Sequence, residues 1–289
     1  MGGTSLQSQE LGDIDEILVC SLANMAFFFG IIIGLSLGLT GGGGSIFAVP
    51  LLIYGLGVPV HDALSVSLAA VALTAGFGAA GAIRSGLLEY RAGLIFAIAG
   101  MLTAPIGVKA SHWFSESTIV TAFAVLMIVV ALSMWRRAAR TADVVPAAVA
   151  KAGPICRFNP NRQLRLTAPC SLALAAAGIG LGILSGFFGI GGGFVIVPAL
   201  TFLTQLDIHR AVATSLLVIT LVGLSGVGAV LVEGRQLPWA LSGLFVLGGF
   251  AGMYTGRLLA RRIAGPRLQK IFALAMVFVA AFVLAFRQF

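Results

Sequence analysis

Two runs of glycine interrupt apolar stretches at matching places in this chain. Residues 40–45 read Thr-Gly-Gly-Gly-Gly-Ser, and residues 189–193 read Gly-Ile-Gly-Gly-Gly. Gly189 follows Gly41 by 148 residues, and this offset aligns two long segments of the chain, 34–108 and 182–256, without a gap. We therefore interpret the chain as a duplicated unit with one glycine break in each copy. Scarce residue types also fall in register, with Pro50 on Pro198, His61 on His209 and Ser67 on Ser215.

The composition is that of a membrane protein. Hydrophobic residues make up 59% of the 289 residues and charged residues 10%, with a mean hydropathy of +1.05. This leaves too little polar surface for a water-soluble globule of that length. Two short apolar stretches, residues 46–56 and 194–206, follow the glycine runs directly. Eight longer ones approach the ~20 residues that a helix needs to cross ~30 Å of hydrocarbon, namely residues 17–39, 62–83, 92–110, 118–135, 167–188, 211–232, 239–256 and 271–286.

Positive charge is concentrated in segments that we expect on the cytoplasmic side. The linker between the copies carries seven Lys and Arg residues against a single acid, Asp143, and basic loops are retained in the cytoplasm. The N-terminal tail carries four acids and no signal-peptide pattern, so we expect it outside the cell. The chain thus divides into an extracytoplasmic tail (1–16), a first transmembrane repeat (17–135), a basic cytoplasmic linker (136–166) and a second transmembrane repeat (167–289).

The charge pattern makes each repeat cross the membrane an odd number of times. Residues 167–206 then supply zero or two crossings, so they form a hairpin that folds back at its glycines, and residues 17–56 do the same. An odd count inserts the second copy upside down relative to the first. The sequence therefore predicts an all-α, multi-pass protein of the inner membrane. It has two inverted-topology repeats, each a glycine-broken helical hairpin followed by three transmembrane helices.

Glycine breaks at matching positions of inverted repeats indicate a transporter whose substrate is held where the two breaks meet. A chain that turns within hydrocarbon exposes N–H and C=O groups, which cost several kcal/mol each unless they face protein, water or a ligand. Short helices starting near Ser45 and Phe194 would point free N–H groups and positive dipole ends at the midplane, which suits an anion. Hydroxyl groups in the helices that follow would add hydrogen bonds. The expected substrate-binding residues are Gly41, Gly42, Gly43, Gly44, Ser45, Ser67, Gly189, Gly191, Gly192, Gly193, Thr214 and Ser215.

Purely structural roles are the alternative to these assignments. The hydroxyls of Ser67, Thr214 and Ser215 have the alternative of bonding back to carbonyls of their own helix. Other glycines are expected only to let helices pack closely, as small residues do in membranes. These packing positions are Gly34, Gly38, Gly78 and Gly226.

The residues around the breaks resemble the sulfite exporter TauE/SafE family of membrane permeases. The matching pieces are residues 38–45 with Pro50 and Leu51, residues 186–193 with Pro198, and residues 211–216, which read Ala-Val-Ala-Thr-Ser-Leu. The first half departs from the last motif, because residues 64–68 read Leu-Ser-Val-Ser-Leu and only Ser67 carries over. The resemblance implies secondary transport of a small sulfur-containing anion, such as sulfite, sulfoacetate or another organosulfonate. It fixes neither the substrate nor the direction.

An anion channel of the same architecture and, with less support, a membrane-embedded enzyme are the alternatives. A channel would share the dipole-lined site, and the sequence does not separate it from a carrier. An enzyme needs a nucleophile–base pair, a carboxylate pair or a metal cluster at membrane depth, and the sequence offers none. We expect no catalytic residue, cofactor, metal or nucleic-acid partner. The expected partners are the anion, membrane lipid and a coupling ion, H⁺ or Na⁺, that the sequence does not identify; the oligomeric state is equally open.

Histidines and cysteines lead to two smaller predictions. His61 and His209 lie near helix starts at the membrane surface, where proton coupling is one role and a purely interfacial position is the other. Cys20, Cys156 and Cys170 are odd in number and lack metal-ligand spacing. We expect them to be inert thiols, in helices and in a reduced cytoplasmic loop.

Overall fold

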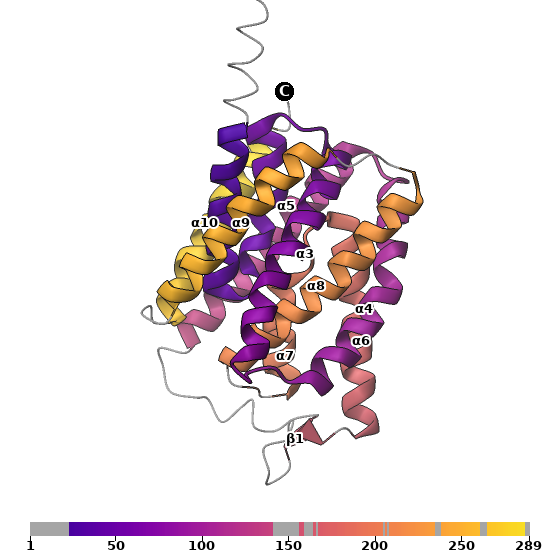
Figure 1. Cartoon of the computed structure of the whole chain (residues 1–289), viewed down its shortest axis with the longest axis vertical. Coiled ribbons are helices and arrows are strands. Elements are labelled where there is room, and N and C mark those ends of the chain that lie inside the picture. The colour runs from indigo at the N-terminus through magenta and orange to yellow at the C-terminus, as the bar shows by residue number, and fades with distance from the viewer. Residues whose placement is uncertain are drawn as a thin grey trace, which may run out of the picture.

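The chain folds into an upright bundle of helices (Figure 1). The computed structural model describes residues 23–140, 156–158, 164–165, 167–204, 206, 208–234, 238–260 and 265–286. A first helix, Ala23–Thr40, opens the first half. It is followed by η1 (Gly43–Phe47), α2 (Ala48–Pro50), η2 (Leu51–Gly55), α3 (Val60–Arg84), α4 (Tyr90–Ser111) and α5 (Glu116–Arg140). The second half contains α6 (Ala168–Phe188), α7 (Gly193–Thr204), α8 (Ile208–Val232), α9 (Trp239–Ala260) and α10 (Gly265–Phe286).

The two halves contain the same elements in the same order. Helices α3 and α8 begin and end at positions that differ by the 148 residues of the repeat, and α4 and α5 match α9 and α10 within two residues. Helix α6 corresponds to the first helix, and α7 corresponds to the segment Gly43–Gly55. That segment is divided into 3₁₀, α and π turns. The π turn follows Pro50, which has no N–H to continue a regular helix.

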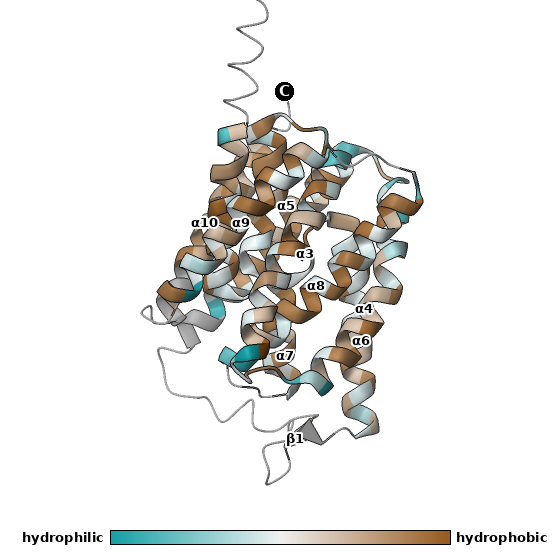
Figure 2. Ribbon diagram, in the orientation of Figure 1, coloured by the Kyte–Doolittle hydropathy of each residue, from teal (hydrophilic) through white to brown (hydrophobic). Residues whose placement is uncertain are grey.

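The helices have the lengths and surfaces of membrane spans, as the sequence predicts. Seven described helices are long and apolar enough to cross a bilayer, and α10 contains the shorter apolar stretch Ile271–Ala285. Figure 2 shows hydrophobic residues along the bundle and hydrophilic ones gathered toward its ends. Helix α7 has only 12 residues, or about 18 Å at 1.5 Å per residue, which is well short of the ~30 Å hydrocarbon core. The broken hairpins therefore turn back inside the bundle.

Glycines let the first helix approach α9 closely. A Cβ atom added at Gly34 would fall on the backbone of Gly249. Helices α6 and α4, the equivalents of the first helix and α9, pack equally closely. A Cβ atom at Gly186 of α6 would fall on the carbonyl oxygen of Ala104 in α4. Helices in lipid associate through such small residues, since burial between them brings no hydrophobic gain. The packing role predicted for Gly34, and by the same geometry for Gly38, is confirmed.

Helices α3 and α8 lie side by side at the centre of the bundle and run antiparallel (Figure 1). A Cβ atom at Gly78 would lie 3.1 Å from Leu216 Cδ1, and one at Gly226 would lie 2.6 Å from Leu68 Cδ2. Leu68 is equivalent to Leu216 and Gly78 is equivalent to Gly226. The same glycine–leucine contact therefore occurs once in each direction between α3 and α8, as it would across a two-fold axis. The packing roles predicted for Gly78 and Gly226 are also confirmed.

A disulfide joins the linker to α6, which corrects the prediction of free thiols. Cys156 and Cys170 are bonded, with an S–S distance of 1.99 Å and a Cα–Cα distance of 4.9 Å. The linker folds back onto the second hairpin, where the Cys156 N–H donates to the carbonyl oxygen of Leu203 at 3.3 Å. Two short linker strands, β1 (Arg157–Phe158) and β2 (Leu164–Arg165), pair antiparallel. The spacing of the cysteines could not reveal this docking, and Cys20 lies outside the described residues.

Replacing Gly252 with alanine should weaken the bundle. The added Cβ atom would collide with the carbonyl oxygen of Ile31 in the first helix, and overpacking of this kind costs roughly 1–3 kcal/mol. The matched control is Gly243→Ala on the same helix, because nothing lies within 4 Å of its added Cβ atom. Thermal unfolding in detergent should give a lower Tm for Gly252→Ala and an unchanged or higher Tm for the control, since alanine favours helix over glycine. Equal Tm values would contradict the close packing of α9.

Candidate functional site

The first break lies between the first helix and η1. Gly41 and Gly42 have φ angles of 71° and 150°, which L side chains rarely adopt. The helix ends with a hydrogen bond of 2.7 Å from the Gly41 N–H to the Leu37 carbonyl. The Ser45 hydroxyl donates to the Gly42 carbonyl at 2.8 Å. Short-range bonds thus use some polar groups of this turn, and Gly42 provides no side chain to cap η1.

The second break is longer and uses more left-handed residues. Helix α6 ends at Gly189, which has a φ of 64° and serves as its C-cap. Gly191 and Gly192 follow with φ angles of 69° and 65°, and α7 begins at Gly193. The backbone therefore reverses within five residues because three of them are free of the Cβ clash in the left-handed region.

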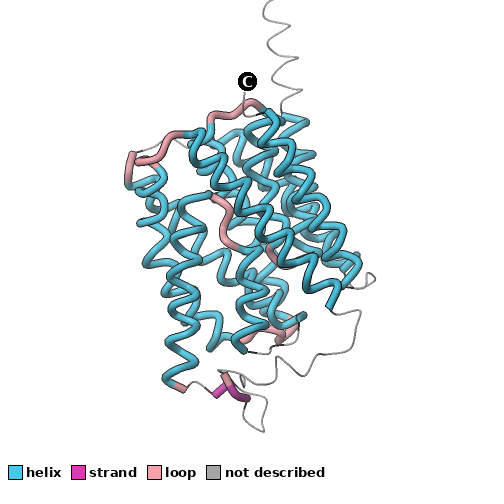
Figure 3. Tube along the Cα trace, turned by 180° about the vertical axis from the view of Figure 1, so that it is seen from behind, coloured by secondary structure: helices cyan, strands magenta, loops and turns pink. Residues whose placement is uncertain are grey.

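The two breaks contact each other, as the sequence predicts. Gly42 and Gly193 lie so close that a Cβ atom on either would fall within 2.7 Å of the other residue's Cα atom. Figure 3 shows loop segments in the interior of the bundle, between the loops that join helices at its two ends. The starts of the two short helices are thus brought together inside the protein.

Each break is also covered by the long central helix of the other half. Leu64 and Val71 of α3 pack against Gly189 and Gly191 of the second break. Ser67 lies between them on the same face, since residues three and seven positions apart share a helix face. The equivalent face of α8 covers the first break, with Val212 against Gly41 and the Ser215 hydroxyl donating to the Gly41 carbonyl at 2.5 Å. Neither half can complete its own break.

Two buried hydroxyls near the breaks have no hydrogen-bond partner among the described residues. They belong to Ser67 and Ser185, both fully buried. The Ser185 Cβ atom would lie 3.4 Å from a Cβ atom added at Gly192. Buried polar groups are nearly always paired, and leaving one unpaired costs about 1–3 kcal/mol. These two hydroxyls are therefore the strongest candidates to bond a substrate.

Sequence reasoning missed Ser185 and placed Thr214 differently from the structure. Ser185 was overlooked because its counterpart in the first half is Leu37, so the repeat gives no signal for it. The Thr214 hydroxyl accepts a hydrogen bond from the Glu89 N–H at 3.1 Å, at the start of α4. Thr214 thus holds the α3–α4 turn in this conformation, whereas its neighbour Ser215 reaches the first break.

Charged groups lie at helix ends and leave the breaks neutral. The nearest neighbours of the break glycines are uncharged. Glu89 and Arg210 form an ion pair of 3.9 Å, and His112 Nε2 lies 3.2 Å from a carboxylate oxygen of Glu233, both at helix termini. In the described part of the chain, no three His, Cys, Asp or Glu residues could share a metal ion. An anion at the breaks would be held by N–H groups, hydroxyls and helix dipoles.

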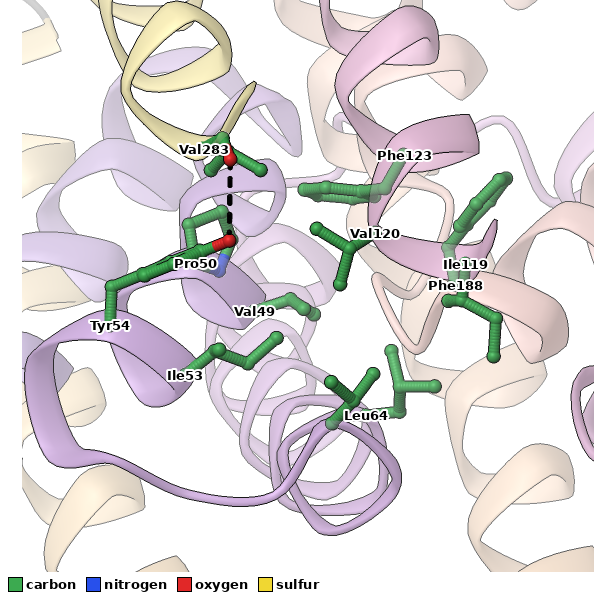
Figure 4. A pocket seen from close by; sticks show the side chains of 11 residues that line it. Val49, Pro50, Ile53, Tyr54, Leu64, Ile119, Val120, Phe123, Phe188 and Val283 are labelled. Atoms are coloured by element: carbon green, nitrogen blue, oxygen red, sulfur yellow. Dashed lines mark hydrogen bonds between the residues drawn. The ribbon is translucent and has the colours of Figure 1, made fainter. Parts of the chain in front are cut away.

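Two cavities beside the breaks, lined by described residues, are small in this conformation. A pocket between the first short segment, α5 and α10 has a volume of only about 10 Å³ and an apolar lining that includes Leu64 and Phe123 (Figure 4). The Tyr54 hydroxyl donates to the Val283 carbonyl at 3.4 Å beside it. A second cavity of about 10 Å³ extends from His61 to Gly189. Each holds at most one water molecule, so neither of these two cavities admits a solute larger than water in this conformation.

Comparisons with known proteins agree with this architecture. The family described as "Sulfite exporter TauE/SafE" matches residues 26–283. A "Probable membrane transporter protein" of Xylella fastidiosa strain 9a5c is 34% identical over 88% of this chain and 91% of its own length. The "Probable membrane transporter protein YunE" of Bacillus subtilis strain 168 is 26% identical over 88% of this chain and 96% of its own. No solved structure matches.

Gly42→Ala should abolish function in protein that still reaches the membrane. The substitution combines a collision with the Gly193 backbone and an unfavourable φ of 150°, and each effect costs roughly 1–3 kcal/mol. Gly57→Ala is the control, because its φ is 65° but nothing lies within 4 Å of the new Cβ atom. Anion uptake into proteoliposomes should fall by roughly tenfold or more for Gly42→Ala and stay near the wild-type rate for Gly57→Ala. Wild-type uptake by both variants would show that the contact between the breaks is dispensable.

Proposed function

Since this chain belongs to the sulfite exporter TauE/SafE family of membrane transporters, we propose that it is a secondary transporter for a small sulfur-containing anion. Sulfite, sulfoacetate and other organosulfonates form the candidate class. The observation that carries this proposal is the contact between Gly42 and Gly193, which brings two helix starts to one point inside a membrane protein. The family and the relatives are membrane transporters, which sets the enzyme alternative aside.

The chemistry of the breaks favours an oxyanion. The N-terminus of a helix presents N–H donors and the positive end of a dipole equivalent to roughly half a charge. Two such ends attract an anion without a buried Arg or Lys, whose desolvation would oppose insertion into the bilayer. The hydroxyls of Ser67 and Ser185 add donors on the side of the second break. A tetrahedral or pyramidal oxyanion accepts several hydrogen bonds from such a ring of donors.

The closed breaks favour a carrier over a channel. A channel needs a continuous polar path, whereas the cavities beside the breaks are about 10 Å³ and largely apolar. A carrier instead opens its site to one side at a time, often by rocking one repeat against the other. The reciprocal contacts between α3 and α8 lie where the two halves meet, and they could serve as the axis of such a rocking motion.

We further propose that the halves insert with opposite orientations in the inner membrane. The basic charge of the linker favours the cytoplasm for it, whereas the Cys156–Cys170 disulfide is of a kind that is rare in that compartment. The antiparallel packing of the equivalent helices α3 and α8 supports this inversion. The exposed turns at Gly86 and Gly234 are equivalent in sequence. On this topology the first faces the cytoplasm and the second faces outside.

Purified protein should gain thermal stability from its anion. A ligand that binds only the folded state stabilises it by RT ln(1 + [L]/Kd), or about 2.7 kcal/mol at one hundred times Kd. Sulfite or sulfoacetate should therefore raise the Tm by several degrees. Chloride and neutral solutes of similar size should leave it unchanged. The shift should shrink in Ser67→Ala and Ser185→Ala, if their hydroxyls donate to the anion.

Ser242→Ala provides the matched control for this measurement. Its hydroxyl is likewise buried and without a partner among the described residues, but it lies in the first turn of α9. The Ser242→Ala variant should keep the full shift. A screen in which only cations or neutral solutes raise the Tm would refute the anion assignment.

Sidedness of labelling should distinguish inverted from parallel halves. Single cysteines at Gly86 and Gly234 have open space around their Cβ atoms, so both should be reactive in a background with Cys20, Cys156 and Cys170 replaced by serine. A membrane-impermeant maleimide added to intact cells should label position 234, and should label position 86 only after the membrane is permeabilised. Labelling of both positions from the same side would rule out inversion.

A further inference from the structure

A large groove lies between the first hairpin and α10. It has a volume of about 540 Å³ and is formed by the first helix, the short segment Gly43–Gly55 and α10. Its lining is apolar apart from the hydroxyls of Ser36 and Tyr54. This volume is within the range of small-molecule sites. An apolar lining of this kind excludes the transported anion, so the groove needs a different occupant.

The equivalent surface, on α5, is packed shut. Ile271 and Phe278 of α10 are 63% and 72% exposed, whereas their counterparts in α5, Phe123 and Val130, are 3% and 8% exposed. On that side the Phe123 ring contacts the ring of Phe188, with centroids 5.7 Å apart. The duplicated architecture therefore does not by itself require a groove.

Smaller side chains contribute to this difference. Ala275 of α10 lines the groove where its counterpart in α5 is Met127, and Ser36 of the first helix lines it where its counterpart in α6 is Leu184. Met127 is fully buried. Substituting each residue by its counterpart thus offers a way to fill the groove with side chains that the fold already accommodates once.

The dimensions of the groove match one leaflet of a bilayer. Its wall on α10 extends from Ile271 to Phe282, which is about 16 Å at 1.5 Å per residue. One leaflet supplies half of the ~30 Å hydrocarbon core, or about 15 Å. The sequence directly before Ile271 contains Arg267 and Lys270, and α10 begins at the end of the bundle where β1 lies (Figure 1). One end of the groove therefore follows a basic stretch of sequence at the end of the bundle.

We propose that the groove binds one acyl chain of an anionic phospholipid from the leaflet on the linker side. The chain fills the apolar space between α10 and the first hairpin, and the headgroup lies at the level of the basic segment, where anionic lipids are attracted. The bound lipid supplies the packing that residues such as Met127 supply at the equivalent surface. This site is independent of which substrate the protein carries.

Native mass spectrometry tests the site directly. Protein in detergent is incubated with an equimolar mixture of dioleoyl phosphatidylglycerol and dioleoyl phosphatidylcholine. The wild type should retain one phosphatidylglycerol in preference to phosphatidylcholine. Ala275→Met should lower the phosphatidylglycerol-bound fraction by about tenfold, which corresponds to losing the burial of about two methylene groups.

The controls separate the groove from general lipid contact. Val277→Met adds the same side chain to α10 at an exposed position that does not line the groove, and it should bind as the wild type does. Ser36→Leu fills the groove from the first helix. It replaces Ala275→Met in this experiment if that variant is not monodisperse, and it should also lower the phosphatidylglycerol-bound fraction. Equal lipid retention by the wild type and the filled variants would overturn the site. Equal retention of the two lipids by the wild type would overturn the anionic headgroup.

Discussion

The contact between the two glycine breaks is the constraint on which the rest of the structure depends. A chain that reverses inside hydrocarbon must cover its exposed N–H and C=O groups with protein or ligand, and this protein covers them with the other break and the other half. Gly42 meets Gly193, α3 packs over the second break, and α8 packs over the first. Because any Cβ atom at the meeting point would collide with backbone, these positions are limited to glycine. The fold thus requires glycine at the residues that the proposed site also uses.

Close helix packing follows from that central contact. The long helices can reach the opposite break only if the bundle is tight, and glycines on the first helix, α4, α6 and α9 bring the backbones together. Lipid offers no hydrophobic gain for such association, so small residues and van der Waals contact provide the stability. Charged residues are left at the helix ends, where Glu89 pairs with Arg210 and His112 lies beside Glu233. The interior can then bind charge only through dipoles and hydroxyls.

The sequence predicted what duplication and composition control, and missed what depends on tertiary packing. The 148-residue offset anticipated the matching elements and the meeting of the breaks, because both copies encode the same turn. The counterpart of Ser185 in the first half is a leucine, so the repeat does not point to it. The Thr214 hydroxyl accepts a hydrogen bond from the Glu89 N–H, a contact that depends on how the neighbouring α3–α4 turn packs. The Cys156–Cys170 bond contradicted the expected thiols because the linker docks onto α6. The groove beside α10 arises where the halves differ, so a repeat-based analysis passes over it.

The most direct test of this account is an experimental structure of the protein determined with sulfite in a lipid nanodisc. We expect density for the anion between the first turns of the two short helices, within hydrogen-bond distance of Ser67 or Ser185. We also expect that Gly42 and Gly193 have moved apart to admit the anion. Anion density at another location, with Gly42 and Gly193 still in contact, would contradict this account.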